Sequence, residues 1–131
     1  MIFVDTGAWF AAIIASDPNH ASTAAWLSSN TAPLLATDYV VDETLTLLRA
    51  RHHHTKARWL GERFFNAQLA AIYHLTDDGL LRAWDVFRDF DDKEWSVTDC
   101  TSRVVIEIFG ITHAVAFDHH FRQFGIVQVV P

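Results

Sequence analysis

The sequence has few cysteines, prolines and glycines for its 131 residues. The single cysteine, Cys100, excludes an intramolecular disulfide and is typical of a reducing compartment, so we expect a cytoplasmic protein. The five glycines stand singly, which excludes a glycine-rich loop that cradles phosphate groups. No linker-like run or internal repeat divides the chain, so we expect one domain over residues 1–131.

Long apolar runs and positive charge are also scarce. The longest apolar stretch, Ala8 to Ala15, is far shorter than a membrane span, and no basic segment of a signal peptide opens the chain, so we expect no membrane association. Lysine and arginine number 10 against 16 acidic residues, which argues against binding nucleic acid by bulk positive charge. A nuclease is not excluded, because bound metal locally offsets the charge of a carboxylate cluster.

What the chain does contain is apolar residues in an alternating pattern. Half of the residues are apolar and 13% are aromatic, which is enough for a hydrophobic core. Short β-prone runs, expected as strands at 2–4, 34–36, 69–75, 112–117 and 126–130, alternate with segments of helical periodicity. This alternation predicts an α/β fold, a three-layer α/β/α sandwich around a central parallel sheet of about four to five strands.

Capping residues mark where the helices begin and end. The expected N-caps are Asp17 before Pro18, Thr37 or Asp38, Thr55, Thr76 and Ser96. Gly110 is expected to end the last long helix, because glycine readily adopts the left-handed conformation of a helix C-terminus.

Four acidic residues stand where strands end or helices begin: Asp5, Glu43, Asp99 and Asp118. Ligands of a parallel sheet bind outside the carboxyl ends of its strands, and Asp5 and Asp118 each follow a predicted strand there. Converging carboxylates repel one another unless a cation is bound, and their oxygens suit Mg²⁺ and Mn²⁺. A metal held in this way can activate water against a phosphodiester.

Two of these assignments have alternatives. Asp99 stands three residues after Ser96, which is the spacing of a capping box, so it caps a helix, binds metal or does both. Glu43 and its neighbour Asp42 point about 100° apart on a helix, so only one of them can face the site.

Two other functions compete with a metal-dependent nuclease. A phosphatase with Asp5 as its nucleophile usually carries a second aspartate two residues later, where this chain has Gly7. The other alternative is a catalytically inactive module that sequesters RNA or a protein partner, with the acids as a structural cluster.

The motifs around the acids resemble the PIN-domain family, in particular the small VapC-type toxins of type II toxin–antitoxin pairs. The resemblance covers essentially the whole chain. It rests on Val4-Asp5-Thr6-Gly7, on Glu43 in an early helix, on Ser96-Val97-Thr98-Asp99-Cys100-Thr101-Ser102, and on Phe117-Asp118-His119-His120-Phe121 followed by Gly125.

The resemblance implies a metal-dependent endoribonuclease that leaves a 3′-hydroxyl and a 5′-phosphate. The family's catalytic and metal-binding acids would match Asp5, Glu43, Asp99 and Asp118, with Mg²⁺ or Mn²⁺ as the cofactor, and this match selects Glu43 over Asp42. Thr6 and Thr98 would orient the carboxylates through hydrogen bonds. The implied partners are an RNA substrate, a cognate antitoxin that occludes the site, and a second copy of the chain in a homodimer.

Three further features of the sequence lie outside the four acids. Basic residues gather between 49 and 63 around His52, His53 and His54, and we interpret this segment as solvated, with contact to RNA phosphates or the antitoxin as the alternative. His119 and His120 follow a site residue, so contact of one of them with the substrate stays open. Cys100 is expected to be a small buried residue.

Overall fold

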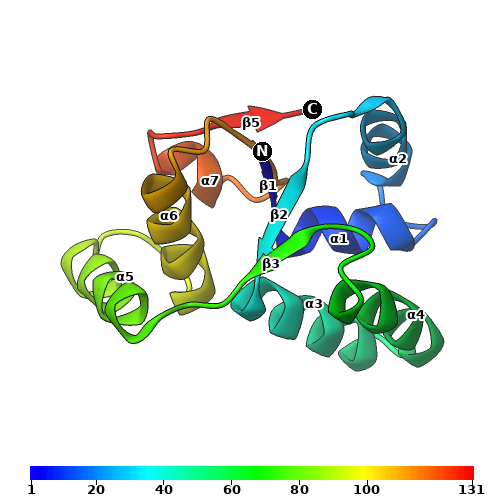
Figure 1. Ribbon diagram of the computed structural model, residues 1–131, viewed down its shortest axis with the longest axis horizontal. Coiled ribbons are helices and arrows are strands. Elements are labelled where there is room, and N and C mark those ends of the chain that lie inside the picture. The colour runs from blue at the N-terminus through cyan, green and yellow to red at the C-terminus, as the bar shows by residue number, and fades with distance from the viewer.

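A parallel five-stranded sheet in the order β3–β2–β1–β4–β5 forms the centre of the protein (Figure 1). The structure is a computed structural model that describes residues 1–131. The strands are β1 Ile2–Val4, β2 Leu34–Thr37, β3 Ala71–Tyr73, β4 His113–Val115 and β5 Gln128–Val130. The helices are α1 Thr6–Ile13, α2 His20–Ser29, α3 Asp38–Ala50, α4 His54–Phe65, α5 Asp77–Asp89, α6 Val97–Phe109 and α7 His120–Gln123. None of these helices is long and apolar enough to span a bilayer.

The connections between strands explain why helices cover both faces of the sheet. From β1 the chain steps to β2 and then β3 on one side, whereas β4 and β5 lie on the other side of β1. Because crossovers between parallel strands are right-handed, opposite directions of travel place their helices on opposite faces. In Figure 1, α1 to α4 accordingly lie on one side of the sheet and α5 to α7 on the other. The predicted three-layer α/β/α architecture is confirmed.

The direction of travel changes between β1 and β4, which pair in parallel from Ile2 and His113 to Val4 and Val115. Open α/β sheets bind their ligands at such a change of direction, outside the carboxyl ends of the strands. The backbone N–H of Asp5 donates to the carbonyl of Val115 at 3.0 Å, so the first residue after β1 lies against the end of β4. The fold therefore creates a candidate site at Asp5.

The core below this point is apolar and closely packed. Phe3 and Val115 on the two central strands are fully buried, as is Phe121 of α7. The rings of Phe3 and Phe121 lie 5.9 Å apart between centroids, which ties the short α7 to the sheet. Full burial of a side chain as large as phenylalanine contributes about 1.5–3 kcal/mol. Apolar packing thus holds the chain segment that follows β4 close to the site.

Most of the predicted helix caps are confirmed. The hydroxyl of Thr37 accepts the N–H of Val40, that of Thr76 accepts the N–H of Gly79, and that of Ser96 accepts the N–H of Asp99. Gly110 has a φ of 60° and ends α6 in the left-handed conformation, as expected. These caps fix the starts of α3, α5 and α6.

Two predicted helix starts are wrong. α2 begins at His20, because the carboxylate of Asp17 accepts the N–H of Asn19 at 2.8 Å and so closes a turn ahead of the helix. α4 begins at His54 rather than after Thr55, because the carbonyl of His53 already accepts the first helical hydrogen bond.

The strands expected at 69–75, 112–117 and 126–130 are shorter than predicted. They reduce to Ala71–Tyr73, His113–Val115 and Gln128–Val130, since pairing in the sheet extends no further than these residues. The β-prone residues at their ends lie in the connecting segments.

Candidate active site

Asp5 lies at the centre of the candidate site, between the end of β1 and the start of α1. Its carbonyl accepts the first hydrogen bonds of α1, from the N–H groups of Ala8 and Trp9, both at 3.1 Å. Its side chain does not cap the helix and is only 5% exposed, and its Oδ1 atom is buried without a hydrogen-bond partner. A buried carboxylate oxygen without a donor destabilises the fold unless something else satisfies it.

The other three acids act electrostatically on Asp5. Burial, which disfavours the charged form, and the negative charge of Asp99 raise the pKa of Asp5 from 3.8 to about 8. The backbone amide of Thr6 opposes this change, whereas Glu43 and Asp118 add to it. The structure therefore brings the four acids predicted from the sequence into one neighbourhood.

Asp99 occupies the first turn of α6 and is 7% exposed. Its Oδ2 atom accepts the backbone N–H of Ser96 at 3.0 Å, while the Oγ atom of Ser96 accepts the N–H of Asp99 at 3.0 Å. This reciprocal pair is a capping box, as its spacing in the sequence predicts. The box leaves the Oδ1 atom of Asp99 without a hydrogen bond in the protein, so Asp99 can cap the helix and still offer an oxygen to a ligand.

Glu43 on α3 faces the candidate site, whereas its neighbour Asp42 faces a different part of the surface. Glu43 is half-buried and contributes to the raised pKa of Asp5. Asp42 is exposed and lines a separate cavity of about 230 Å³ with Phe65 and His74, among others. The structure thus favours Glu43 over Asp42 as the residue that faces the site.

Asp118 lies three residues beyond the end of β4, because this strand is shorter than predicted. Its Oδ1 atom accepts the backbone N–H of His120 at 3.0 Å, which closes a turn at the start of α7. The Nδ1 atoms of His119 and His120 lie 3.4 Å and 3.3 Å from the same oxygen. Asp118 is the most exposed of the four acids, and it is the one in contact with two histidines.

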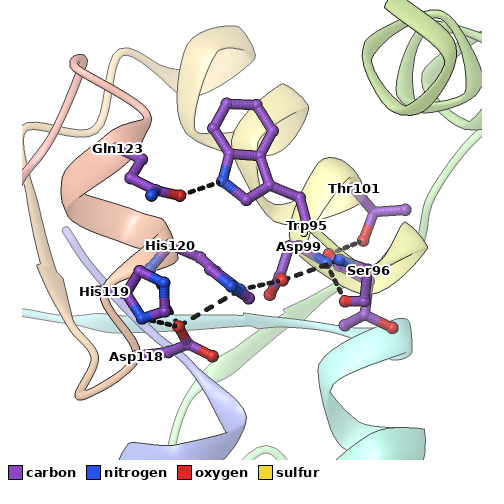
Figure 2. A network of polar contacts seen from close by, with 9 residues as sticks. Trp95, Ser96, Asp99, Thr101, Asp118, His119, His120 and Gln123 are labelled. Atoms are coloured by element: carbon purple, nitrogen blue, oxygen red, sulfur yellow. Dashed lines mark hydrogen bonds and ion pairs between the residues drawn. The ribbon is translucent and has the colours of Figure 1, made fainter. Parts of the chain in front are cut away.

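His120 makes a contact that the sequence analysis missed. Its Nδ1 atom lies 2.8 Å from Oδ2 of Asp99, so the ring bridges Asp99 on α6 and Asp118 after β4 (Figure 2). The pattern Asp-x-His after a predicted strand signals only the local turn, in which Asp118 accepts the backbone N–H of His120, and no local pattern signals the contact with Asp99.

The structure shows no carboxylate contact for the two predicted threonine hydroxyls. The Oγ1 atom of Thr6 is buried without a partner, and no hydrogen bond joins the Thr98 hydroxyl to an acid. The carbonyl of Thr98 accepts the hydroxyl of Thr101 at 2.6 Å, which strengthens the first turn of α6. Orientation of the carboxylates by these two hydroxyls stays a prediction.

Cys100 does not supply a nucleophile. The side chain is fully buried, as expected, and burial together with the charge of Asp99 raises the pKa of its thiol to about 11, against an opposing effect of Arg103. The thiol is therefore protonated at neutral pH, and a thiolate is the form that attacks.

The basic segment 49–63 lies on the surface at the end of α3 and along α4. Arg58 pairs with Glu62 at 3.3 Å, and the guanidinium of Arg63 lies 3.8 Å from the centre of the Trp59 ring. Arg49 and Arg58 line a groove of about 600 Å³ between the two helices. The segment is solvated, as the sequence analysis expected, and its contact with RNA or an antitoxin stays an open alternative.

A profile of the PIN domain matches residues 2–127. This chain belongs to the PIN-domain family. A protein of Mycobacterium tuberculosis named 23S rRNA-specific endonuclease VapC20 is 34% identical over 131 residues, which cover all of this chain and 99% of that protein. The same figures hold for the protein in strain CDC 1551 / Oshkosh and in strain H37Rv.

Two solved structures are similar to this chain along its whole length. The crystal structure of M. tuberculosis VapC20, described as a sarcin–ricin loop cleaving toxin, matches with a TM-score of 0.93 and 32% identity over the whole of both chains. The crystal structure of FitAcB from Neisseria gonorrhoeae matches with a TM-score of 0.72, covering all of this chain and 97% of that chain. Its identity of 19% makes the second likeness one of fold alone.

Proposed function

We propose that this protein is a metal-dependent endoribonuclease and the toxin of a toxin–antitoxin pair. Its full-length identity of 34% with a named rRNA endonuclease supports the reaction class. The observation that carries the proposal is the position of Asp5, a buried carboxylate with a free oxygen at the point where the sheet changes direction, under the influence of three further acids.

The residues around Asp5 suit a divalent cation. The Oδ1 atom of Asp5 is buried and has no donor, and Asp99 keeps one oxygen free of hydrogen bonds. Glu43 and Asp118 complete a set of oxygen donors, which Mg²⁺ and Mn²⁺ prefer. Asp5, Asp99, Glu43 and Asp118 would hold the ion, and a bound ion would supply an activated water and positive charge against the phosphodiester.

The burial of the four acids indicates different roles among them. Asp5 and Asp99 are the most buried of the four acids, and backbone hydrogen bonds at the starts of α1 and α6 hold them in place. They would form the buried part of the metal site. Asp118 lies at the exposed edge, where an RNA backbone can approach. In the proposed reaction water attacks phosphorus and the bond to the 3′-oxygen breaks, which leaves a 3′-hydroxyl and a 5′-phosphate.

The substrate and partners follow by likeness to the named relatives. We take 23S rRNA as the first candidate substrate, because the relatives with 34% identity are named for its cleavage. We also propose an antitoxin that covers the site, a homodimer, and a place in the cytoplasm, where the free, buried Cys100 stays reduced. Thr6 and Thr98 keep their proposed role beside the acids.

The test is a map of RNA 5′ ends after induced expression of the parent protein and of Asp5→Asn. The expected result is growth arrest with new 5′-phosphate ends at one or a few positions of 23S rRNA for the parent, and neither effect for the variant. New ends in another RNA would keep the ribonuclease and replace the substrate. Growth arrest without any new RNA ends would contradict the proposal and favour a module that only sequesters a partner.

A further inference from the structure

His120 lies between two of the four acids, at the first residue of α7. Its Nδ1 atom is 2.8 Å from Oδ2 of Asp99 and 3.3 Å from Oδ1 of Asp118, and its side chain is only 13% exposed (Figure 2). The ring thus joins a helix on one face of the sheet to the segment that follows β4.

The partners of His120 fix the position of its proton. Ionised carboxylates only accept hydrogen bonds, so Nδ1 carries a hydrogen and donates it. The neutral ring in this state has its hydrogen on Nδ1 and a lone pair on Nε2. His120 therefore acts on Asp99 as a donor with a fixed direction.

This donor determines which oxygen of Asp99 stays available. Oδ2 accepts both the backbone N–H of Ser96 and Nδ1 of His120, whereas Oδ1 accepts no hydrogen bond in the protein. Two donors that converge on one oxygen prevent rotation of the carboxylate, since rotation would break both bonds. The free oxygen is then held in one direction.

The helix that carries His120 is itself held in place. One turn further along α7, the side-chain oxygen of Gln123 accepts the indole N–H of Trp95 at 2.9 Å (Figure 2). The ring of Phe124 packs edge-on against Trp95 with centroids 5.1 Å apart, and Phe121 is fully buried. These contacts allow the ring of His120 to act as a rigid support.

The geometry points to His120 as a positioning residue that fixes the carboxylate of Asp99, and with it that of Asp118, in the direction needed to bind the cation. The inference rests on the proposed function, because it assigns His120 a role in that same site. His119 is the natural contrast, since its side chain is 71% exposed and contacts only one of the four acids, Asp118, at 3.4 Å, although its ring also packs against that of His120.

The test is a calorimetric titration of the purified full-length protein with Mn²⁺, without RNA. Removal of a group that orients a metal ligand typically weakens metal binding about 10- to 100-fold. We expect His120→Ala to raise the Kd for Mn²⁺ at least about tenfold. His120→Asn should keep the Kd within about threefold of the parent value, because its amide nitrogen can stand in the place of Nδ1 and donate the same hydrogen bond. His119→Ala is the matched control and should bind Mn²⁺ like the parent.

Three results would overturn the inference. The first is parental Mn²⁺ affinity in folded His120→Ala. The second is a loss of Mn²⁺ affinity of about tenfold or more in His120→Asn relative to the parent. This comparison does not need His120→Ala, so it decides the matter even if His120→Ala does not fold. The third is loss of RNA cleavage in both variants with unchanged Mn²⁺ affinity, because His120 would then act on the RNA or the water itself.

Asp5→Asn separates this inference from the proposed function. If Asp5→Asn loses Mn²⁺ binding while His120→Ala keeps it, the metal site stands and the role of His120 is wrong. If Asp5→Asn binds Mn²⁺ and cleaves RNA like the parent, the proposed metal site at Asp5 is wrong, and if the parent itself cleaves no RNA, the proposed function is wrong.

Discussion

Ser96 and Asp99 hold each other in place through two backbone N–H groups at the start of α6. The Oγ atom of Ser96 accepts the N–H of Asp99 and the carboxylate of Asp99 accepts the N–H of Ser96, each at 3.0 Å. The box stabilises the helix and keeps Asp99 in its first turn, where the helix dipole favours negative charge. The same two hydrogen bonds therefore connect the stability of α6 to the geometry of the candidate site.

Replacement of Ser96 tests this connection. Ser96→Ala should lower the free energy of unfolding by about 1 kcal/mol through the lost cap and should also reduce RNA cleavage, because Asp99 is less firmly held. Thr76→Ala is the matched control, since Thr76 caps α5 in the same way by accepting the N–H of Gly79. It should lose similar stability in urea unfolding and cleave RNA at the parental rate. Equal cleavage by the two variants would contradict the connection.

The neighbours Glu43 and Asp42 allow a second matched comparison. Glu43 acts on Asp5, whereas Asp42 is exposed and lines another cavity. Glu43→Gln should reduce the rate of RNA cleavage by about tenfold or more, in the range typical of changes around a metal, and Asp42→Asn should leave it unchanged. A larger loss in Asp42→Asn than in Glu43→Gln would show that the wrong acid has been assigned to the site.

The raised pKa of Asp5 predicts how stability depends on pH in the absence of metal. Between about pH 4 and pH 8 the folded protein keeps the proton of Asp5, while the unfolded chain, with the ordinary pKa of 3.8, releases it. Because the folded state then binds more protons, the contribution of Asp5 to the free energy of unfolding falls as the pH rises through this window. Urea unfolding in the presence of a chelator should show this fall.

Asp5→Asn should remove that part of the pH dependence, and at pH 8 it should be more stable than the metal-free parent. Asp91→Asn, in an exposed loop, is the control and should keep the parental slope. A slope that is the same in the parent and in Asp5→Asn would mean that Asp5 is not buried among like charges.

Divalent metal should reverse this destabilisation. A ligand that binds only the folded state at about 100 times its Kd adds about 2.7 kcal/mol to the free energy of unfolding. Mn²⁺ should therefore raise the melting temperature of the parent at pH 8 by several degrees, and much less in Asp5→Asn or Asp99→Asn. An equal rise in the parent and in both variants would place the bound metal elsewhere.

The sequence predicts the architecture well because local signals and the fold agree. The alternation of strands and helices gives the parallel sheet, and the hydroxyls of Thr37, Thr76 and Ser96 start the helices expected of them. Asp17 and Thr55 show the limit of such signals. Each has the chemistry of a cap, yet Asp17 closes a turn before α2 and Thr55 lies inside α4, because the hydrogen bonds of the preceding turn decide where a helix begins.

The candidate site shows a similar division. Strand ends and a capping box place Asp5 and Asp99 from local sequence, whereas the choice of Glu43 over Asp42 needs either the family resemblance or the direction in which α3 faces. The contact of His120 with Asp99 spans 21 residues and depends on how α7 packs against α6, so no local pattern encodes it. The free oxygen of Asp5 likewise becomes visible only when every neighbouring donor is placed.

The proposed metal-dependent cleavage is tested most directly with 23S rRNA and the purified parent protein, Asp5→Asn and Asp99→Asn, each with Mn²⁺ or with a chelator. A metal-dependent ribonuclease should cleave the RNA with Mn²⁺ and should not cleave it with the chelator. Both variants should be folded by circular dichroism and should lose more than the roughly 100-fold in rate that changes around a metal typically cost. Cleavage of the same RNA by both variants at the parental rate, or by the parent in the chelator, would contradict a metal-dependent ribonuclease centred on Asp5 and Asp99.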